Sequence, residues 1–537
     1  GLWRETEGNP LFVLEAVRAG FGSSAAGRTT LTPTVHAVIT ARLDRLSPGA
    51  RRITEVAATI GREFSAAVLA TAVGRAEDDL TDDLDELWEH HIVRERGTAY
   101  DFTHDRLREV ALELISPARR RILHRRVAEA IEAHHAADLG PVSARLAVHY
   151  ASAGLEARAV EAYERAARHA HRVFALDDCI ALLERALRML ESSPRGAARD
   201  EVELRLRAAL GVPLVARRGY GAAEVLHCYE RALTLHRKLG RRPAPEVLRG
   251  LALHAVSTLR LDRAAALGRE LASYDAERTS RTEGEFVLGV TAFWRGRFAE
   301  AEHHLRGAIA HYRIEDAPLH VTRYAQDPLG VCLSRLALTH LFRGRPADAD
   351  AAMRDARRVA AELDDPMTTC YVRAFDAILA ALEPGLRDLP AAVDDLDVVT
   401  RTMRIGYFAI VARLLRGWRD VLEGDPVGVV QIRGAIERFR AEQPLHLTLA
   451  LSLLARAHLG TGEVAAARAA VVEGLELTED RGQLYLLPEL LRLDAEVRAR
   501  AGDHSGAVGS ARRAVEVATA LGTPWLRERA AATRRAL

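Results

Sequence analysis

At 537 residues the chain is too long for a single hydrophobic core, so it must form several domains or a solenoid of repeated units. A formal net charge of +1 excludes a global electrostatic field that would attract nucleic acid or an acidic substrate. Aromatic residues make up only 5% of the chain, and alanine, leucine and arginine dominate, as is typical of closely packed helices.

Features that mark a membrane or secreted protein are missing from the sequence. It contains no apolar run long enough to span a membrane and no signal peptide. Its four cysteines are scattered without a CxxC pair, which indicates buried, reduced thiols. These observations predict a cytoplasmic protein.

The first predicted element is a helix that begins after a turn formed by Gly8, Asn9 and Pro10. Proline is well suited to the first turn of a helix, because its missing N–H would have no partner there. Residues 20–32, which include Gly-Ser-Ser and Arg-Thr-Thr, predict a flexible linker.

Residues 33–115 predict a winged-helix domain. Two short alternating runs around Gly97 and Thr98 indicate a β-hairpin, and a further helix begins at Asp105. Helices are expected before the hairpin at 34–46, 48–60, 65–73 and 78–91.

The helix before the hairpin stands where many winged helices present a DNA-recognition helix. Between residues 78 and 91 it carries seven acidic side chains, which would repel phosphates. Nucleic-acid binding through this helix is therefore not expected, and an arm that packs on another domain is favoured.

Residues 116–145 predict a connecting helix, which begins at Ser116 and Pro117 and has an arginine-rich face. Its arginines favour a solvated surface, with binding of nucleic acid or an acidic partner as the alternative.

The rest of the chain consists of recurring helical hairpins. Gly296 separates two short helices, and alanine follows it at positions +5 and +12. Related copies recur at intervals of about 40 residues, with one copy skipped, which indicates stacked units that bury their apolar faces on one another. The other turn glycines are Gly154, Gly344, Gly424, Gly462 and Gly502, of which Gly424 has a poorly fitting second helix. Two irregular stretches, 219–225 and 324–331, interrupt the repeats.

These motifs together carry a family resemblance. The repeats resemble the tetratricopeptide (TPR) pattern, GNPLF around Pro10 resembles the lid motif of STAND-class regulatory ATPases, and FTHD around His104 resembles the MHD-type motif of the same class. The resemblance implies that Pro10 packs against adenine and that His104, with Asp105 beside it, approaches the β-phosphate of ADP. It divides the chain into a lid remnant and linker at 1–27, a winged-helix arm at 28–115, a connecting helix at 116–145 and a repeat array at 146–537.

The fold class expected is mainly all-α: a small winged-helix domain with a short β-hairpin, followed by an α-solenoid of TPR-like hairpins. No GxxxxGK[ST] motif occurs, so this chain is not expected to be an enzyme, and ATP or ADP would bind in a longer parent protein whose nucleotide core precedes Gly1. Adjacent histidine pairs lack metal-ligand spacing, so neither a metal site nor a catalytic site is predicted.

The function implied is that of a sensor. The array would bind a protein, peptide or small inducer on its concave surface and would control a cyclase, kinase or transcription output outside this chain, with possible oligomerisation in the active state. Two alternatives stay open, a TPR scaffold without nucleotide control and a DNA-binding regulator that acts through the winged helix.

Overall fold

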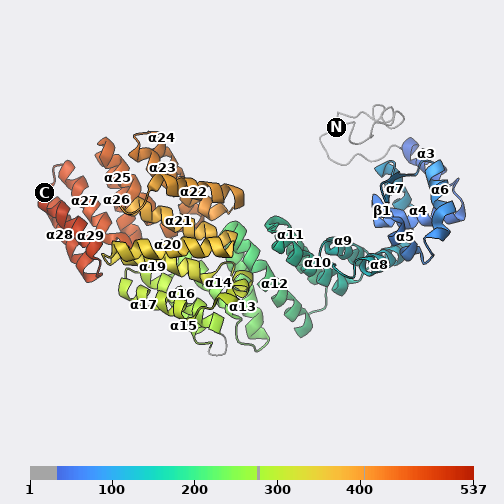
Figure 1. Cartoon of the computed structure of the whole chain (residues 1–537), viewed down its shortest axis with the longest axis horizontal. Helices are drawn as coiled ribbons and strands as arrows, with labels where there is room; N and C mark the ends of the chain where they lie inside the picture. The colour runs from blue at the N-terminus through green and yellow to red at the C-terminus, as the bar shows by residue number, and fades with distance from the viewer. Residues whose placement is uncertain (1–32, 275–277, 404) are drawn as a thin grey trace. The chain divides into compact units, whose positions relative to one another are not determined.

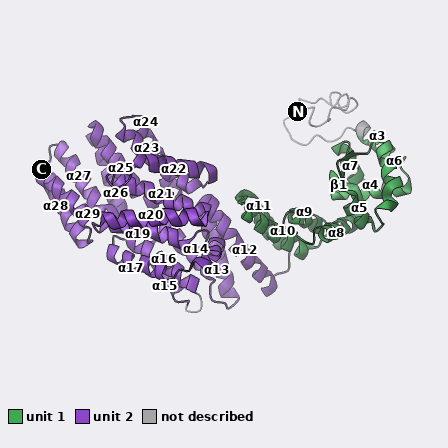
Figure 2. Ribbon diagram, in the orientation of Figure 1, with its two compact units in different colours: residues 1–193 green, residues 194–537 purple. Residues whose placement is uncertain are grey.

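The computed structural model describes residues 33–274, 278–403 and 405–537, so the predicted lid remnant at 1–27, with Gly8, Asn9 and Pro10, lies outside the described residues. The chain divides into two compact units, Gly1–Ser193 and Pro194–Leu537 (Figure 2). Figure 1 gives the order of the elements within each unit. Within the described ranges, no helix is both long enough and apolar enough to cross a membrane.

The first unit begins with a winged-helix domain. Its strands form a three-stranded antiparallel sheet in the order β1-β3-β2, with Tyr100 of β3 opposite Phe64 of β1 and Glu95 of β2. The elements are α3 (Pro33–Leu43), α4 (Pro48–Ile60), β1 (Glu63–Ser65), α5 (Ala66–Val73), the 3-10 turn η1 (Asp78–Leu80), α6 (Thr81–Glu89), β2 (Val93–Arg96), β3 (Ala99–Phe102) and α7 (Asp105–Glu113).

The predicted hairpin is confirmed, and its turn contains Gly97 with φ of 65°. Strand β1 was not expected, since three residues are too few to show an alternating pattern. Its last residue, Ser65, is also the N-cap of α5 and accepts a hydrogen bond from the Val68 N–H at 3.3 Å. One serine therefore ends the strand and begins the helix.

Four further helices follow in the same unit. Ser116 and Pro117 begin α8 as the sequence indicates, because the serine side chain accepts from the Arg119 N–H and proline occupies the first turn. The predicted array begins at residue 146, yet these helices cluster with the winged helix, and the units separate after Ser193. They are α8 (Pro117–His134), α9 (Ser143–Ser152), α10 (Glu156–Arg172) and α11 (Leu176–Leu190).

The second unit is a helical-repeat solenoid, which confirms the predicted fold class. Successive helices pack as hairpins, namely α12/α13, α14/α15, α16/α17, α19/α20, α21/α22, α23/α24, α25/α26 and α27/α28. The bounds are α12 (Ala197–Arg218), α13 (Ala223–Lys238), α14 (Pro245–Ser257), α15 (Leu261–Ala272), α16 (Arg278–Trp294), α17 (Phe298–His311), η2 (Ile314–Asp316), α18 (Ala317–Tyr324), α19 (Pro328–Phe342), α20 (Pro346–Leu363), α21 (Pro366–Leu382), α22 (Leu389–Met403), α23 (Gly406–Leu422), α24 (Val427–Glu442), η3 (Pro444–His446), α25 (Leu447–Thr461), α26 (Val464–Arg481), η4 (Leu484–Leu486), α27 (Leu487–Arg500), α28 (His504–Ala520) and α29 (Pro524–Ala536).

The six glycines that define the repeat in the sequence all lie in turns between helices. Each has φ between 71° and 85°, a left-handed conformation that glycine adopts without a steric penalty. They are Gly154, Gly296, Gly344, Gly424, Gly462 and Gly502.

The two helices of each hairpin differ in burial. In α14 and α19, the first helices of their pairs, nearly every residue is buried, whereas α20 buries one stripe of small and apolar side chains. A helix that is apolar on all sides must be covered on all sides. That cover comes from distant repeats, because α12 contacts α23, α14 contacts η3 and α19 contacts α29. The solenoid therefore winds tightly enough for its inner helices to meet.

Candidate functional site

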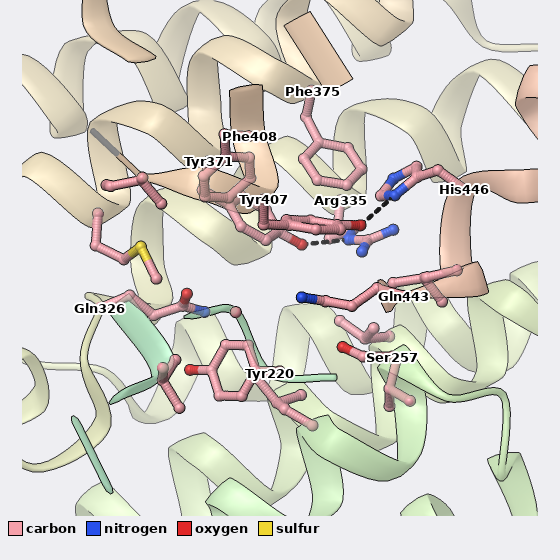
Figure 3. A pocket seen from close by; sticks show the side chains of 18 of the residues that line it. Tyr220, Ser257, Gln326, Arg335, Tyr371, Phe375, Tyr407, Phe408, Gln443 and His446 are labelled. Atoms are coloured by element: carbon pink, nitrogen blue, oxygen red, sulfur yellow. Dashed lines mark hydrogen bonds between the residues drawn. The ribbon is translucent and has the colours of Figure 1, made fainter. Parts of the chain in front are cut away.

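A cavity of about 50 Å³ lies among the inner helices of the second unit (Figure 3). Its walls come from α12, α14, α16, α19, α21 and α23 and from the segments between helices that contain 219–220, Gln326, Ile405 and 443–446. Most of the lining is apolar or aromatic. The polar side chains that face it are Tyr220, Ser257, Gln326, Arg335, Tyr371, Tyr407, Gln443 and His446.

Arg335 is the cation of this cavity and belongs to α19. Its side chain is almost completely buried, with 2% of its surface exposed. Nε donates a hydrogen bond to the Tyr371 hydroxyl, and the guanidinium lies 4.1 Å from the ring centre of Phe375 and 4.7 Å from that of Trp294. Within the described part of the chain, Nη1 has no hydrogen-bond partner and no carboxylate forms an ion pair with Arg335. A buried guanidinium is therefore left without a counter-ion.

His446 faces the same cavity from η3. Its Nδ1 is hydrogen-bonded with the Tyr407 hydroxyl, whereas Nε2 has no partner among the residues described. Burial and then the charge of Arg335 lower the pKa of His446 to about 3, so the imidazole is neutral at physiological pH. Burial also raises the pKa of Tyr407, which keeps its hydroxyl protonated. The cavity therefore carries a single positive charge.

Gln326 supplies an amide from the segment that joins α18 to α19. This side chain is buried, and its Nε2 atom finds no acceptor in the described residues. The segment is held by Asp327, which accepts from the Tyr312 hydroxyl at 2.8 Å and caps α19 through the Leu329 N–H at 2.8 Å. The Asp327 backbone N–H donates to Thr368 Oγ1 at 2.9 Å. These bonds fix the backbone of a segment that has no regular structure of its own.

Tyr220 forms part of the cavity wall below Gln326 and rests on a buried ion pair. Its hydroxyl accepts a hydrogen bond from Arg249 and donates to the Tyr324 carbonyl at 3.3 Å. Arg249 Nε donates to Glu283 at 2.9 Å, and Glu283 also bonds with His320 Nδ1 at 2.7 Å. Burial opposes ionisation of Glu283, but Arg249 and His320 outweigh it and hold its pKa below the ordinary value. In contrast to Arg335, Arg249 has a carboxylate partner.

The two irregular stretches singled out in the sequence meet at this cavity. The first contributes Tyr220 and the second contributes Gln326, and the Tyr220–Tyr324 hydrogen bond joins them. The first stretch also packs against Gln443: a Cβ atom at Gly221 would lie 2.3 Å from Gln443 Cγ, so only glycine fits. The sequence identified both interruptions of the repeat but gave no sign that they meet.

Of the motif residues that carry the STAND resemblance, His104 and Asp105 are described and lie in the first unit. His104 immediately precedes α7 as its N-cap residue, and Asp105 accepts from Arg62 at 2.7 Å. Gly8, Asn9 and Pro10 fall outside the described residues, so their relation to His104 stays a prediction. None of the six turn glycines is among the described residues that line the cavity. Their role is in the turns of the repeat.

Two carboxylates of α6 form hydrogen bonds within the winged-helix domain. Asp83 accepts from Arg75 at 2.6 Å, and Glu86 accepts from the Ser47 N–H at 2.7 Å at the start of α4. Five other acidic side chains of this region are exposed, namely Asp78, Asp79, Asp82, Asp85 and Glu89. The surface of the helix is therefore negative.

Comparisons with known proteins give distant similarities. No family model matches the chain. An uncharacterized protein of Rhizobium meliloti (strain 1021) is 26% identical over 532 residues, which cover 94% of this chain and 50% of the relative. The chain thus spans about half the length of the curated relative that it matches.

Two solved structures are similar at lower identity. A Rap protein complexed with competence and sporulation factor is 14% identical, with a TM-score of 0.48, over 67% of this chain and 98% of that one. A Signal Transduction ATPase with Numerous Domains (STAND) protein with a tetratricopeptide repeat sensor, from Pyrococcus horikoshii, is 10% identical, with a TM-score of 0.30, over 100% of this chain and 68% of that one. The helical-repeat architecture is established by the paired helices of the chain itself.

Proposed function

We propose that the chain is the arm and sensor portion of a nucleotide-switched signalling protein of the STAND type, and that the cavity of the second unit receives its effector. One observation carries the proposal: Arg335, Gln326 and His446 direct buried polar groups without partners at the same cavity. Such groups are expensive to bury, and a convergent set of them in an apolar pocket is typical of a ligand site.

The location of the cavity explains how an effector would act on the protein. The lining joins inner helices from several repeats with connecting segments that are far apart in the sequence. A ligand that contacts residues from more than one repeat stabilises the wound arrangement over any arrangement that separates those residues. The effector would thereby shift the population of states of the array, and the array would control an output that lies outside this chain.

The arm is proposed to hold the inactive state through nucleotide. The resemblance of FTHD to the MHD-type motif places His104 near the β-phosphate of ADP in a longer parent protein, and the Asp105–Arg62 ion pair is suited to fix the backbone beside it. In this proposal the chain itself is not an enzyme and holds no complete nucleotide site. The exposed acidic residues of α6 favour contact with another protein domain over contact with DNA.

Replacement of His104 in the longer protein tests the switch. His104→Ala is expected to reduce ADP retention and to raise basal output, because an imidazole N–H that contacts the phosphate is lost. His135→Ala serves as the control, since His135 is an exposed histidine of the same unit. ADP retention and output that both equal those of the wild type would refute the switch role of His104.

A scaffold that binds a protein without nucleotide control is the second candidate. The exposed apolar pair Val427 and Val430 on α24, three residues apart on one helix face, favours a contact with a protein partner. Limited proteolysis of the longer protein with and without ADP separates the two candidates. Cleavage around residues 20–32 and Ser116 that does not depend on ADP would favour the scaffold.

A further inference from the structure

We propose that the ligand of the cavity is a small organic acid with a single carboxylate, which binds to Arg335; this inference rests on the proposed effector role of the same cavity.

The charge of the cavity selects a monoanion. Of the described residues that line it, Arg335 alone is charged at neutral pH, because His446 is held neutral. The aromatic faces of Phe375 and Trp294 offset part of the desolvation of Arg335. They do not replace a counter-ion, because a buried charge is stabilised fully only by a paired and hydrogen-bonded partner. A dianion such as phosphate would in turn leave its own second charge uncompensated among apolar walls.

The neighbouring buried ion pair does not supply the missing charge. Glu283 is already bonded to Arg249 and His320, and both of its oxygens are occupied by these donors. Its partner Arg249 reaches the cavity wall only through the hydroxyl of Tyr220. The carboxylate of Glu283 therefore has no oxygen left for Arg335, which remains available for a group that comes from outside the chain.

The available hydrogen-bond donors suit a carboxylate. Arg335 Nη1 and Gln326 Nε2 are both unpaired within the described residues, and both need an acceptor. Where Tyr407 donates to Nδ1 of His446, the Nε2 atom carries the proton and becomes a third donor. In Figure 3 the amides of Gln326 and Gln443 extend from opposite sides into the space that faces Arg335. A carboxylate with its two acceptor oxygens can satisfy two or three such donors at once.

The size and the apolar walls restrict the rest of the molecule. A volume of about 50 Å³ accommodates roughly three to five waters, or a ligand with a similar number of non-hydrogen atoms. Phe286, Met367 and Phe408 provide an apolar wall for a short hydrocarbon group. Acetate and propionate, with four and five non-hydrogen atoms, meet these requirements, whereas a peptide does not fit inside.

Calorimetry and thermal unfolding of the 537-residue chain test this inference. Sodium propionate and sodium acetate are the probes, at an ionic strength held constant with chloride, and propionamide is the neutral match for propionate. We expect at least one of the acids to bind saturably and to raise Tm, and we expect propionamide to do neither. Arg335→Gln should weaken binding at least tenfold. Arg440→Gln, at an exposed ion pair with Glu473 of the same unit, should leave it unchanged.

Gln326→Leu keeps the test decisive if Arg335→Gln does not fold. This variant removes one donor, keeps the size of the side chain and should weaken binding about tenfold or more, the effect of one hydrogen bond to a charged acceptor. Binding of phosphate in preference to the acids, equal binding of propionamide, or no binding at all would overturn the inference. Binding of a free-acid tripeptide without binding of the small acids would likewise overturn it, because the carboxylate would then belong to a peptide.

The failure of this inference can be told apart from the failure of the proposed function. The binding measurements need no nucleotide, and the His104→Ala test needs no acid. An effector of another class would leave the effect of His104→Ala on ADP retention intact. Conversely, the acids could bind while His104→Ala retains as much ADP as the wild type. The inference about the ligand would then stand, and the proposed nucleotide switch would fail.

Discussion

Replacement of Arg249 by methionine tests the electrostatic basis of the cavity wall. Arg249 and Glu283 are 1% and 0% exposed, and their ion pair joins α14 to α16. Arg249→Met removes the cation and leaves Glu283 buried with His320 as its remaining partner. Loss of one member of a buried pair costs about 3–5 kcal/mol, and we expect the low end of that range because His320 still donates.

Two further variants calibrate this value. Arg278→Met breaks an ion pair with Asp316 in which the arginine is 52% exposed, so its cost should stay below about 1 kcal/mol. The double variant Arg249→Met/Glu283→Gln has no buried charge at this position, and its amide can still bond with His320. It should recover most of the lost stability, since a buried pair replaced by neutral groups is often close to neutral overall.

Urea unfolding followed by tryptophan fluorescence measures these differences. Trp294 and Trp418 are buried in the second unit and report its transition. The pKa of Glu283 is lowered in the folded chain, so its contribution is complete above the ordinary glutamate pKa of about 4.3 and is lost as the pH falls through the folded value. The difference between wild type and Arg249→Met should therefore shrink in acid. A cost equal to that of Arg278→Met at pH 7 would show that Glu283 is not held as an anion.

Two other substitutions give independent checks on the second unit. The carboxylate of Glu489 is buried and accepts two hydrogen bonds from Arg492, at 2.7 and 2.8 Å. Burial opposes ionisation of Glu489, but the bonds and charge of Arg492 lower the pKa of Glu489 to about 2. Glu489→Gln should thus cost about 3 kcal/mol in urea unfolding at pH 7, a difference that is complete above about pH 4.3 and disappears as the pH falls to 2. Gly221→Ala should lower the free energy of unfolding by about 1–3 kcal/mol, because its Cβ would overlap Gln443, whereas Gly509→Ala in α28 meets no atom within 4 Å and should be neutral or slightly stabilising.

The repeat and the hairpin could be predicted because both depend on local patterns. A turn glycine with small residues at fixed offsets reports how one helix packs on the next, and all six such glycines have the left-handed conformation. Alternation around Gly97 likewise reports a hairpin whose strands are adjacent in sequence. The short strand β1 escaped prediction, because it pairs with β3 more than 30 residues later and has too few residues for a periodicity.

The cavity could not be predicted, because its walls meet only through the winding of the solenoid. Tyr220, Arg335 and His446 come from positions more than 100 residues apart, and no repeat period specifies which inner helices will face one another. One signal was available in the sequence. Arg335 is the only residue of Pro328–Phe342 that is always charged at neutral pH, and most of the other side chains of this helix are apolar. A lone charge on a helix buried on all sides needs a partner, and that partner can come from outside the chain.

The irregular segments and Arg335 together form the polar part of the cavity. In an unbroken repeat each hairpin would pack directly on the next, and Tyr220 and Gln326 would not be placed beside the buried cation. Here the interruptions carry their own supports, Tyr220 on the Arg249–Glu283 pair and Gln326 beside the anchored Asp327. A ligand that neutralises Arg335 while it bonds to Gln326 would add stability of RT ln(1 + [L]/Kd) to the wound state alone. The contact between Gln443 and the Arg218 carbonyl, at 3.4 Å, is a weak link between the same distant repeats. A ligand bound at the centre would thus stabilise the contacts between these distant repeats.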